Sequence, residues 1–321
     1  IALGRTLSGL SCGAPGVPGR HAEAAAVEET TVRKRHGWFA LFAAVSALAG
    51  SPPAPRIVAT IFPLYDWTRE IVGPDGHAVQ LLPAGVEIHS WAPAPSDLAA
   101  IQTAELFVWA GPHLEPWAER LVQSTRTNTA RFEAAAHLPS DFAPPGDPHF
   151  WTDPLAAISV VRALTEVLAQ QVPAHAESYR QRARAYVERI AELHQDLDRL
   201  VRGARRRTIV FAGHRAFEPM ARRYGLTFVT PIAALSPEVP PTPRAMADLV
   251  RAVRESGARA VFHEEIIEPR MARVVAAECG APLRLLHGLH NRTPEEAARG
   301  ETWLSLYRRN LEALREELGS P

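Results

Sequence analysis

Histidines are the side chains of this chain that could most plainly do chemistry. The 321 residues include 13 histidines but only two cysteines, Cys12 and Cys279. So few cysteines support neither a disulfide framework nor a cysteine-based zinc or iron–sulfur site. Neutral imidazole, by contrast, is the commonest metal ligand in proteins, and protonation makes it release the metal. The composition therefore directs attention to places where several histidines could meet.

The stretch Asp147–Pro154, with the sequence DPHFWTDP, holds one imidazole on a stiff segment. Pro148 fixes its own φ angle and biases the preceding residue toward extended backbone, so His149 leaves a rigid entry. Asp153 followed by Pro154 is typical of the N-cap and first residue of a helix, because the carboxylate can accept an unpaired backbone N–H. His149 is therefore expected on a rigid loop just before a helix. A surface histidine beside a well-capped helix is the plainer alternative.

Short apolar runs alternate with helical patterns from residue 56 onward, which predicts parallel β-α-β units. Strands are expected at residues 56–61, 77–82, 106–110, 208–212, 226–230, 258–263 and 282–286. Helices are expected at residues 63–72, from 97 onward with Ser96 as the N-cap, after the stretch 111–117, and at 215–224, 244–255, 269–279 and 302–318. A proline-rich loop is expected at residues 231–243.

Between these two groups of elements, helical sequence runs from about residue 153 to residue 203, with a break near Pro173. Its second part, residues 174–202, would be roughly 40 Å long, too long for one small domain. We therefore predict an α/β fold of two parallel-sheet lobes, residues 55–170 and 204–321, joined by one long rigid helix within residues 171–203.

Four histidines and one glutamate occupy equivalent places in this predicted fold, at strand ends or in strand-to-helix loops. They are His89, His149, His214, His287 and Glu264. Ligands of open parallel sheets bind beyond the carboxyl ends of the strands, so these side chains are expected to converge. Each histidine alone has the plainer explanation of a hydrogen-bonded loop residue, but four in equivalent places favour a metal site.

Acidic side chains near these histidines are expected to take part as well. Glu264 or Glu87 could coordinate a metal directly, or could hold a ligand histidine through its other ring nitrogen. Five further histidines lack a strand-end setting and are expected at the surface: His77, His113, His137, His175 and His194.

The charge balance and the N-terminal segment bear on where the protein works. The 35 basic and 35 acidic residues give a formal net charge of zero, so no broad field directs the chain to nucleic acid or an anionic membrane.

Residues 1–31 are interpreted as a disordered leader or a start site placed too early. In residues 32–49 a basic segment, Arg33–His36, precedes an apolar run too short to span a bilayer, which predicts a signal peptide cleaved near Ala49. A retained membrane anchor is the alternative. No cysteine follows the apolar run, so no lipid attachment is expected there, and the mature protein is expected in the periplasm.

From about Ile57 to Leu318 the chain resembles the periplasmic substrate-binding proteins of bacterial ABC transporters for zinc and manganese. The resemblance rests on GVEIHSWAPAPSD at residues 85–97, DPHFWTDP at 147–154, and FAGHRAF at 211–217 with RYGL at 223–226. It implies two α/β lobes joined by one long helix, with a single metal in the cleft bound by two ligands from each lobe. His89, His149 and His214 fall on the first three ligand positions.

The resemblance also implies a function. The protein would capture a divalent transition metal, Zn²⁺ or alternatively Mn²⁺, and deliver it to an ABC permease for import. It would act as a monomer, would meet the membrane only through the permease, and would bind no nucleic acid.

The fourth ligand position is where this chain departs from the family. Family members commonly carry an aspartate after the last strand, whereas this chain reads LHGLHN from Leu286 to Asn291. We expect His287 as the fourth ligand, with His290 and then Glu264 as alternatives. Four imidazoles would suit tetrahedral Zn²⁺, while Mn²⁺ would favour more carboxylate. The chain also lacks the histidine-rich loop of many zinc receptors, which weakens zinc without favouring manganese.

Three other interpretations fit parts of the pattern. A zinc hydrolase would use three histidines, a bound water and Glu264 as general base, but no HExxH segment is present and a fourth protein ligand would close the open position. A haem or metal chelate could occupy the same scaffold, because a fold alone does not set its ligand. That interpretation predicts a wider, more basic cleft without convergent histidines. A purely structural metal would lock the two lobes together.

If the protein captures and delivers a metal, two properties are expected, one for the pH of metal release and one for the movement of the lobes. Release is expected around pH 6–7, where unperturbed histidines protonate. The long helix is expected to permit only small tilts of the lobes and shifts of the loops.

Overall fold

The computed structural model describes residues 54–124, 129–231 and 242–319. Residues Ala54–Pro321 form one compact unit. The expected leader, the expected signal peptide and most of the expected proline-rich loop lie outside the described residues. Within the described residues, no helix is both long and apolar enough to cross a membrane.

The first sheet is built from β1 (Arg56–Ala59), β2 (His77–Gln80), β3 (Leu106–Trp109) and β4 (Ala130–Glu133), with helices α2 (Phe62–Val72), α3 (Pro95–Gln102) and α4 (Pro116–Ser124) between them. All pairings are parallel, in the order β2-β1-β3-β4. The central strands β1 and β3 are the apolar runs that the sequence marks. Strand β4 was not predicted, because this edge strand reads ARFE and buries only Phe132.

The second sheet repeats this topology in the order β6-β5-β7-β8, again fully parallel. Its elements are β5 (Thr208–Phe211), α7 (Glu218–Tyr224), β6 (Thr227–Val229), α8 (Pro243–Ser256), β7 (Val261–His263), α9 (Arg270–Cys279), β8 (Leu283–Leu285), α10 (Pro294–Ala298) and α11 (Trp303–Leu318). The predicted α/β fold of two parallel-sheet lobes is therefore confirmed, and each of the predicted strands is shorter than expected.

The starts of α3 and α7 differ from the prediction by two residues or more. Helix α3 is capped at Ala94 and not at Ser96, because Pro95 takes the first helical position and the Asp97 carboxylate accepts the Ala94 N–H at 2.8 Å. Helix α7 begins at Glu218 and not at Arg215, so the loop that carries His214 is longer than expected.

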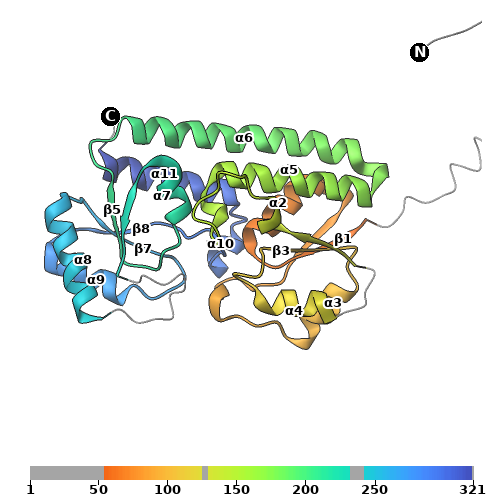
Figure 1. Cartoon of the computed structure of the whole chain (residues 1–321), viewed down its shortest axis with the longest axis horizontal. Coiled ribbons are helices and arrows are strands. Elements are labelled where there is room, and N and C mark those ends of the chain that lie inside the picture. The colour runs from red at the N-terminus through yellow and green to blue at the C-terminus, as the bar shows by residue number, and fades with distance from the viewer. Residues whose placement is uncertain (1–53, 125–128, 232–241, 320–321) are drawn as a thin grey trace, which may run out of the picture. The chain divides into compact units, whose positions relative to one another are not determined.

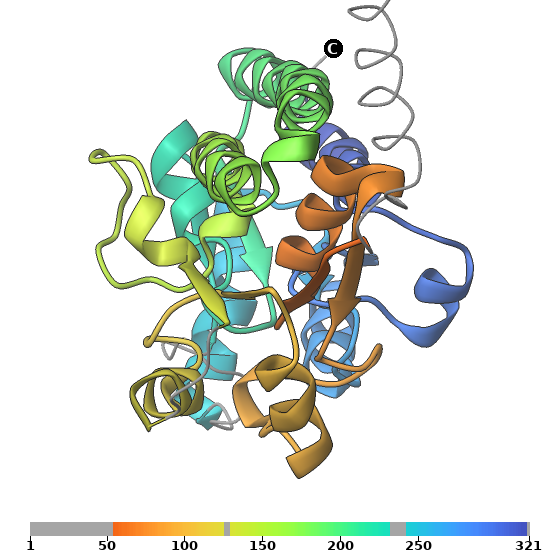
Figure 2. The ribbon, with the colours of Figure 1, turned by 90° about the vertical axis from the view of Figure 1, so that its right-hand side faces the viewer.

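Two long helices connect the sheets. Helix α5 (Pro154–Gln171) is followed by a short turn, Pro173–His175, and then by α6 (Ala176–Arg202), as the break near Pro173 predicts. The Asp153 carboxylate caps α5 by accepting the Leu155 N–H at 2.9 Å, which confirms the predicted N-cap. Helix α6 runs along both lobes (Figure 1), packing on α2 and α5 at one end and on α7 and α11 at the other. Figure 2 shows α5 and α6 end-on and side by side.

The chain after β8 leaves its own sheet and docks on the first lobe. The Gly85 N–H donates to the Arg292 carbonyl at 2.7 Å, and the Phe62 N–H donates to the His290 carbonyl at 3.3 Å. The Asn291 amide donates to the carbonyls of Pro83 at 2.7 Å and Val86 at 2.9 Å. These bonds hold residues 290–292 against the loop that leads to His89.

Candidate metal centre

Three of the predicted histidines meet in one place. Their ligand nitrogens, one from each ring, all lie within 4.8 Å of one another. His89 sits on the turn Ile88–Ser90, His149 lies immediately before the turn Phe150–Thr152, and His214 follows β5. The Nε2 atoms of His149 and His214 are 3.2 Å apart. Two nitrogens at zinc-bond length of a tetrahedral ion would be about 3.3 Å apart, so this spacing fits a small metal ion.

Each of these histidines has a carboxylate oxygen next to its Nδ1 atom. Glu87 Oε1 lies 2.5 Å from Nδ1 of His89, Asp147 Oδ1 lies 2.8 Å from Nδ1 of His149, and Glu264 Oε2 lies 2.9 Å from Nδ1 of His214. For His89 and His149 this contact is a hydrogen bond, which holds the proton on Nδ1 and leaves the Nε2 lone pair for a metal. The His214–Glu264 contact has the same length but not the geometry of a hydrogen bond.

Two of the carboxylates are held by the same local geometry. Glu87 also accepts the backbone N–H of His89 at 3.1 Å, and Asp147 accepts that of His149 at 2.9 Å. The sequence suggests Glu87 and Glu264 as partners of ligand histidines, and the structure adds Asp147. Its signal was the two-residue spacing to His149, which repeats the spacing of Glu87 and His89.

Burial favours the neutral form of the His89 and His149 rings. Removal from water lowers the pKa of His149 to about 4, although Asp147 favours the charged ring. Burial also lowers the pKa of His89, again against the attraction of Glu87. A neutral ring is the form that binds metal, and protons compete only below the pKa. For these two rings, competition is therefore expected at lower pH than the window of pH 6–7 that unperturbed histidines suggest.

His287, our first choice for the fourth ligand, is engaged elsewhere. Its Nδ1 accepts the Leu289 N–H at 2.9 Å, and its Nε2 lies 3.1 Å from Glu296 Oε2. Asn310 binds both the N–H and the carbonyl of His287, at 2.7 Å each. Over the described residues, the group of converging ligand atoms includes neither His287 nor His290.

His290, the second choice, is buried beside the three histidines. Its ring centroid is 6.4 Å from that of His89. Among the described residues, neither ring nitrogen makes a hydrogen bond. The nearest groups are Glu87 Oε2, 3.4 Å from Nε2, and Glu265 Oε1, 3.9 Å from Nδ1. Burial opposes a charge on this ring, but Glu87, Glu265 and Glu264 outweigh it and raise the pKa of His290 to about 9.

Glu264, the third choice, faces His214 through Oε2, and only 5% of the residue is exposed. That position suits orientation of His214. Glu265, the next residue, was not singled out from the sequence, since adjacent acidic residues after a strand are common on surfaces.

The histidines expected at the surface lie away from the centre. His77, His113 and His137 are exposed, and His175 and His194 are half-buried. His194 bonds to the Tyr224 hydroxyl at 2.8 Å, and His175 lies 3.7 Å from Asp75.

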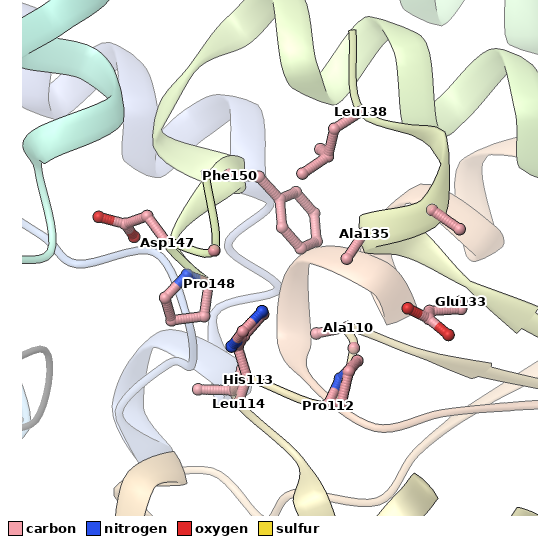
Figure 3. A pocket seen from close by; sticks show the side chains of 13 residues that line it. Ala110, Pro112, His113, Leu114, Glu133, Ala135, Leu138, Asp147, Pro148 and Phe150 are labelled. Atoms are coloured by element: carbon pink, nitrogen blue, oxygen red, sulfur yellow. The ribbon is translucent and has the colours of Figure 1, made fainter. Parts of the chain in front are cut away.

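A cavity of about 250 Å³ lies behind the loop that carries His149 (Figure 3). The ends of β3 and β4 wall it, with Leu138, Phe150 and Pro148 supplying apolar surface and His113 and Glu133 supplying polar groups. Of the paired carboxylates and histidines, Asp147 alone lines it. The cavity is smaller than pockets for drug-sized organic ligands, which are about 300–1,000 Å³. His89, His149 and His214 do not line it. It gives no support to the chelate interpretation.

Comparison with known proteins agrees with this geometry. Residues 57–317 match the family model of ZnuA, the periplasmic zinc-uptake complex component A. Over 283 residues the chain is 30% identical to the high-affinity zinc uptake system protein ZnuA of Bacillus subtilis (strain 168), which covers 82% of this chain and 87% of that protein. It is 27% identical to the zinc-binding protein AdcA of Streptococcus pyogenes serotype M1 over 81% of this chain, and spans 55% of that longer relative.

A solved structure shares the fold. The Zn(II)-bound ZnuA-like domain of Streptococcus pneumoniae AdcA has a TM-score of 0.73 at 27% identity, covering 82% of this chain and 98% of that chain. The resemblance to metal-binding receptors of ABC transporters is thereby confirmed. Because the family model spans most of the chain and the architecture agrees, the chain belongs to the ZnuA family of periplasmic zinc-uptake components.

Proposed function

We propose that this protein binds Zn²⁺ outside the cytoplasm with high affinity and delivers it to an ABC permease for import. The observation that carries the proposal is the convergence, within 4.8 Å, of three imidazole nitrogens from two lobes. Membership of a family of uptake components, and a zinc-bound structure of a similar domain, support it. The family is not one of enzymes, which goes against the hydrolase alternative.

The donor set favours zinc over manganese. The converging atoms are nitrogens, while the carboxylates of Glu87, Asp147 and Glu264 face the Nδ1 atoms. Imidazole suits Zn²⁺, whereas Mn²⁺ prefers carboxylate and water oxygens. Manganese remains the alternative metal on this scaffold.

For the fourth ligand we favour His290 over His287. His287 would have to give up its contacts with Leu289 and Glu296 before either nitrogen could bind a metal. His290 has no hydrogen bond to give up within the described residues, and it already lies beside His89. Ligation by His290 would complete a tetrahedral set of nitrogens.

Capture and release follow from ligands that come from both lobes. The metal would be held between the His89 and His149 loops of the first lobe and His214 of the second, so its release requires loss of that bridge.

We propose that the protein is exported to the periplasm by a signal peptide without lipid attachment, as residues 32–49 indicate. We also propose that it acts as a monomer. The lobes are expected to move little, because residues 290–292 are bonded to the first lobe.

The test is the metal content of the protein purified under mild conditions, compared with His290→Ala and His287→Ala variants. We expect about one zinc per chain, lost or strongly weakened by His290→Ala and retained by His287→Ala. The reverse pattern would restore His287 as the fourth ligand. A folded protein that carries no transition metal and cannot be loaded with zinc would overturn the proposed function.

A further inference from the structure

We propose that Glu265 is the residue that positions His290 as the fourth metal ligand, an inference that rests on the proposed zinc site. The three converging histidines share one arrangement, with a carboxylate oxygen 2.5–2.9 Å from Nδ1. Such carboxylates fix the ring and its tautomer, so that Nε2 faces the metal. His290 has a carboxylate on the same side of its ring, and that carboxylate is Glu265.

Glu265 is itself held in place. Its side chain is 2% exposed, and its Oε2 accepts the Gly288 N–H at 2.7 Å. Its Oε1 has no hydrogen bond among the described residues, although it is buried. A buried carboxylate oxygen without a donor is costly, so a donor is expected to reach it in the working state.

Only one of the two neighbouring imidazoles can supply that donor. His287 Nδ1 lies 3.6 Å from Glu265 Oε1, but its lone pair already accepts the Leu289 N–H, so this nitrogen carries no proton to donate. His290 Nδ1, 3.9 Å away, makes no hydrogen bond. A ring movement of about 1 Å would shorten this distance to a hydrogen bond.

The same movement fits metal binding. His290 Nε2 faces Glu87 Oε2 at a distance of 3.4 Å. If Nε2 turns to a metal bound by the other three rings, Nδ1 must keep the proton, and Glu265 is placed to accept it. Glu265 would then do for His290 what Asp147 does for His149.

Gly288 leaves the space that this contact needs. A Cβ atom at Gly288 would lie 3.0 Å from His290 Nδ1 and 3.5 Å from Glu265 Oε1. A side chain there would press on the His290 ring and displace it, while its contact with Glu265 would be of ordinary length. The close approach of the His290 ring to this backbone explains why residue 288 is a glycine. The Gly288 carbonyl accepts the Trp151 indole N–H at 2.9 Å, which fixes the backbone there.

The experiment compares Glu265→Gln with Glu296→Gln, the matched change at the carboxylate beside His287, each in the wild-type and His290→Ala backgrounds. Zinc affinity is measured by competition with a chromophoric chelator. The visible spectrum of the Co²⁺-loaded protein reports coordination number, and thermal unfolding of the metal-free protein reports any general loss of structure.

We expect Glu265→Gln to weaken zinc binding by about 10–100-fold and to change the Co²⁺ spectrum toward that of His290→Ala. In the His290→Ala background the same substitution should have no further effect on affinity, because its target is gone. Glu296→Gln should change affinity by less than about threefold in either background.

Equal effects of Glu265→Gln and Glu296→Gln would overturn the inference, as would an equal loss of affinity in the His290→Ala background. Failure of the proposed function looks different, since the wild-type protein would then take up neither Zn²⁺ nor Co²⁺. Zinc binding that is abolished by His149→Ala but untouched by Glu265→Gln would keep the function and reject only the role of Glu265.

Discussion

At the scale of the residue, the centre combines rings that resist protonation with one that favours it. Burial lowers the pKa of His149 to about 4, whereas the surrounding glutamates raise that of His290 to about 9. The charged His290 ring therefore balances Glu87 and Glu265 when no metal is bound. A zinc ion brings its own positive charge to the same place, and the two charges would oppose each other. Metal binding is thus expected to expel the His290 proton.

This exchange predicts proton release. At about pH 7.5 the metal-free His290 ring is protonated and must lose a proton to bind, whereas His149 is already neutral. We expect about one proton released per zinc in the wild-type protein and close to none in His290→Ala. Calorimetric titrations in buffers of different ionisation enthalpy measure this number. Equal release from the two proteins would contradict ligation by His290.

A control comes from the stability of the metal-free protein. A pKa raised from 6.5 to about 9 on folding stabilises the folded state fully below pH 6.5, and that stabilisation is lost as the pH rises to about 9. The wild-type protein should therefore lose stability across this window. The same curve for His290→Ala should be flatter.

At the scale of the element, the irregular segment 290–292 helps to position two of the predicted ligands. Asn291 is fully buried, donates to the carbonyls of Pro83 and Val86, and accepts from Gln80 Nε2 at 3.0 Å. It therefore fixes the loop that carries Glu87 and His89 against the segment that carries His290. The positions of His89 and His290, two of the predicted ligands, therefore depend on the side-chain amide of Asn291.

The variant Asn291→Ala tests this link. It removes two hydrogen bonds to partly buried carbonyl oxygens and truncates a fully buried side chain, so we expect a loss of about 1–2 kcal/mol in the free energy of unfolding. Zinc affinity should fall as well, because both flanking ligands lose their support. Urea denaturation of the metal-free protein and chelator competition measure the two effects. His77→Ala, a change at an exposed residue of the same lobe, is the control and should alter neither.

At the scale of the molecule, several contacts tie the two lobes together outside the metal centre. Arg223 pairs with Asp141 at 2.6 Å and Asp153 at 2.9 Å, across from the second lobe to the first. The Tyr307 hydroxyl donates to the Thr152 carbonyl at 2.6 Å, and α6 packs along both lobes. Wide opening would break these contacts together, so movement confined to the ligand loops costs less.

Hydrogen exchange with and without zinc should show this distribution. We expect added protection in the loops around residues 86–91, 146–152, 212–217 and 286–291, and little change in α5, α6 and α11. His149→Ala with zinc present is the control and should resemble the metal-free protein. Strong added protection across the whole contact between the lobes would instead indicate large domain closure and would refute small loop movement.

The two-lobe fold, its connecting helices and the convergence of His89, His149 and His214 could be predicted from the sequence. Apolar runs and caps such as Asp153-Pro154 are local signals, and the carboxyl ends of parallel strands meet wherever such strands pair. The sequence did not reveal β4, whose single buried residue Phe132 leaves no apolar run. Nor did it separate His287 from His290, because two histidines three residues apart look alike until their neighbours are known. The folded chain engages both ring nitrogens of His287 through Leu289 and Glu296, and it leaves His290 between Glu87 and Glu265. The His290 contacts join residues distant in sequence, and the His287 contacts depend on how the chain turns after β8.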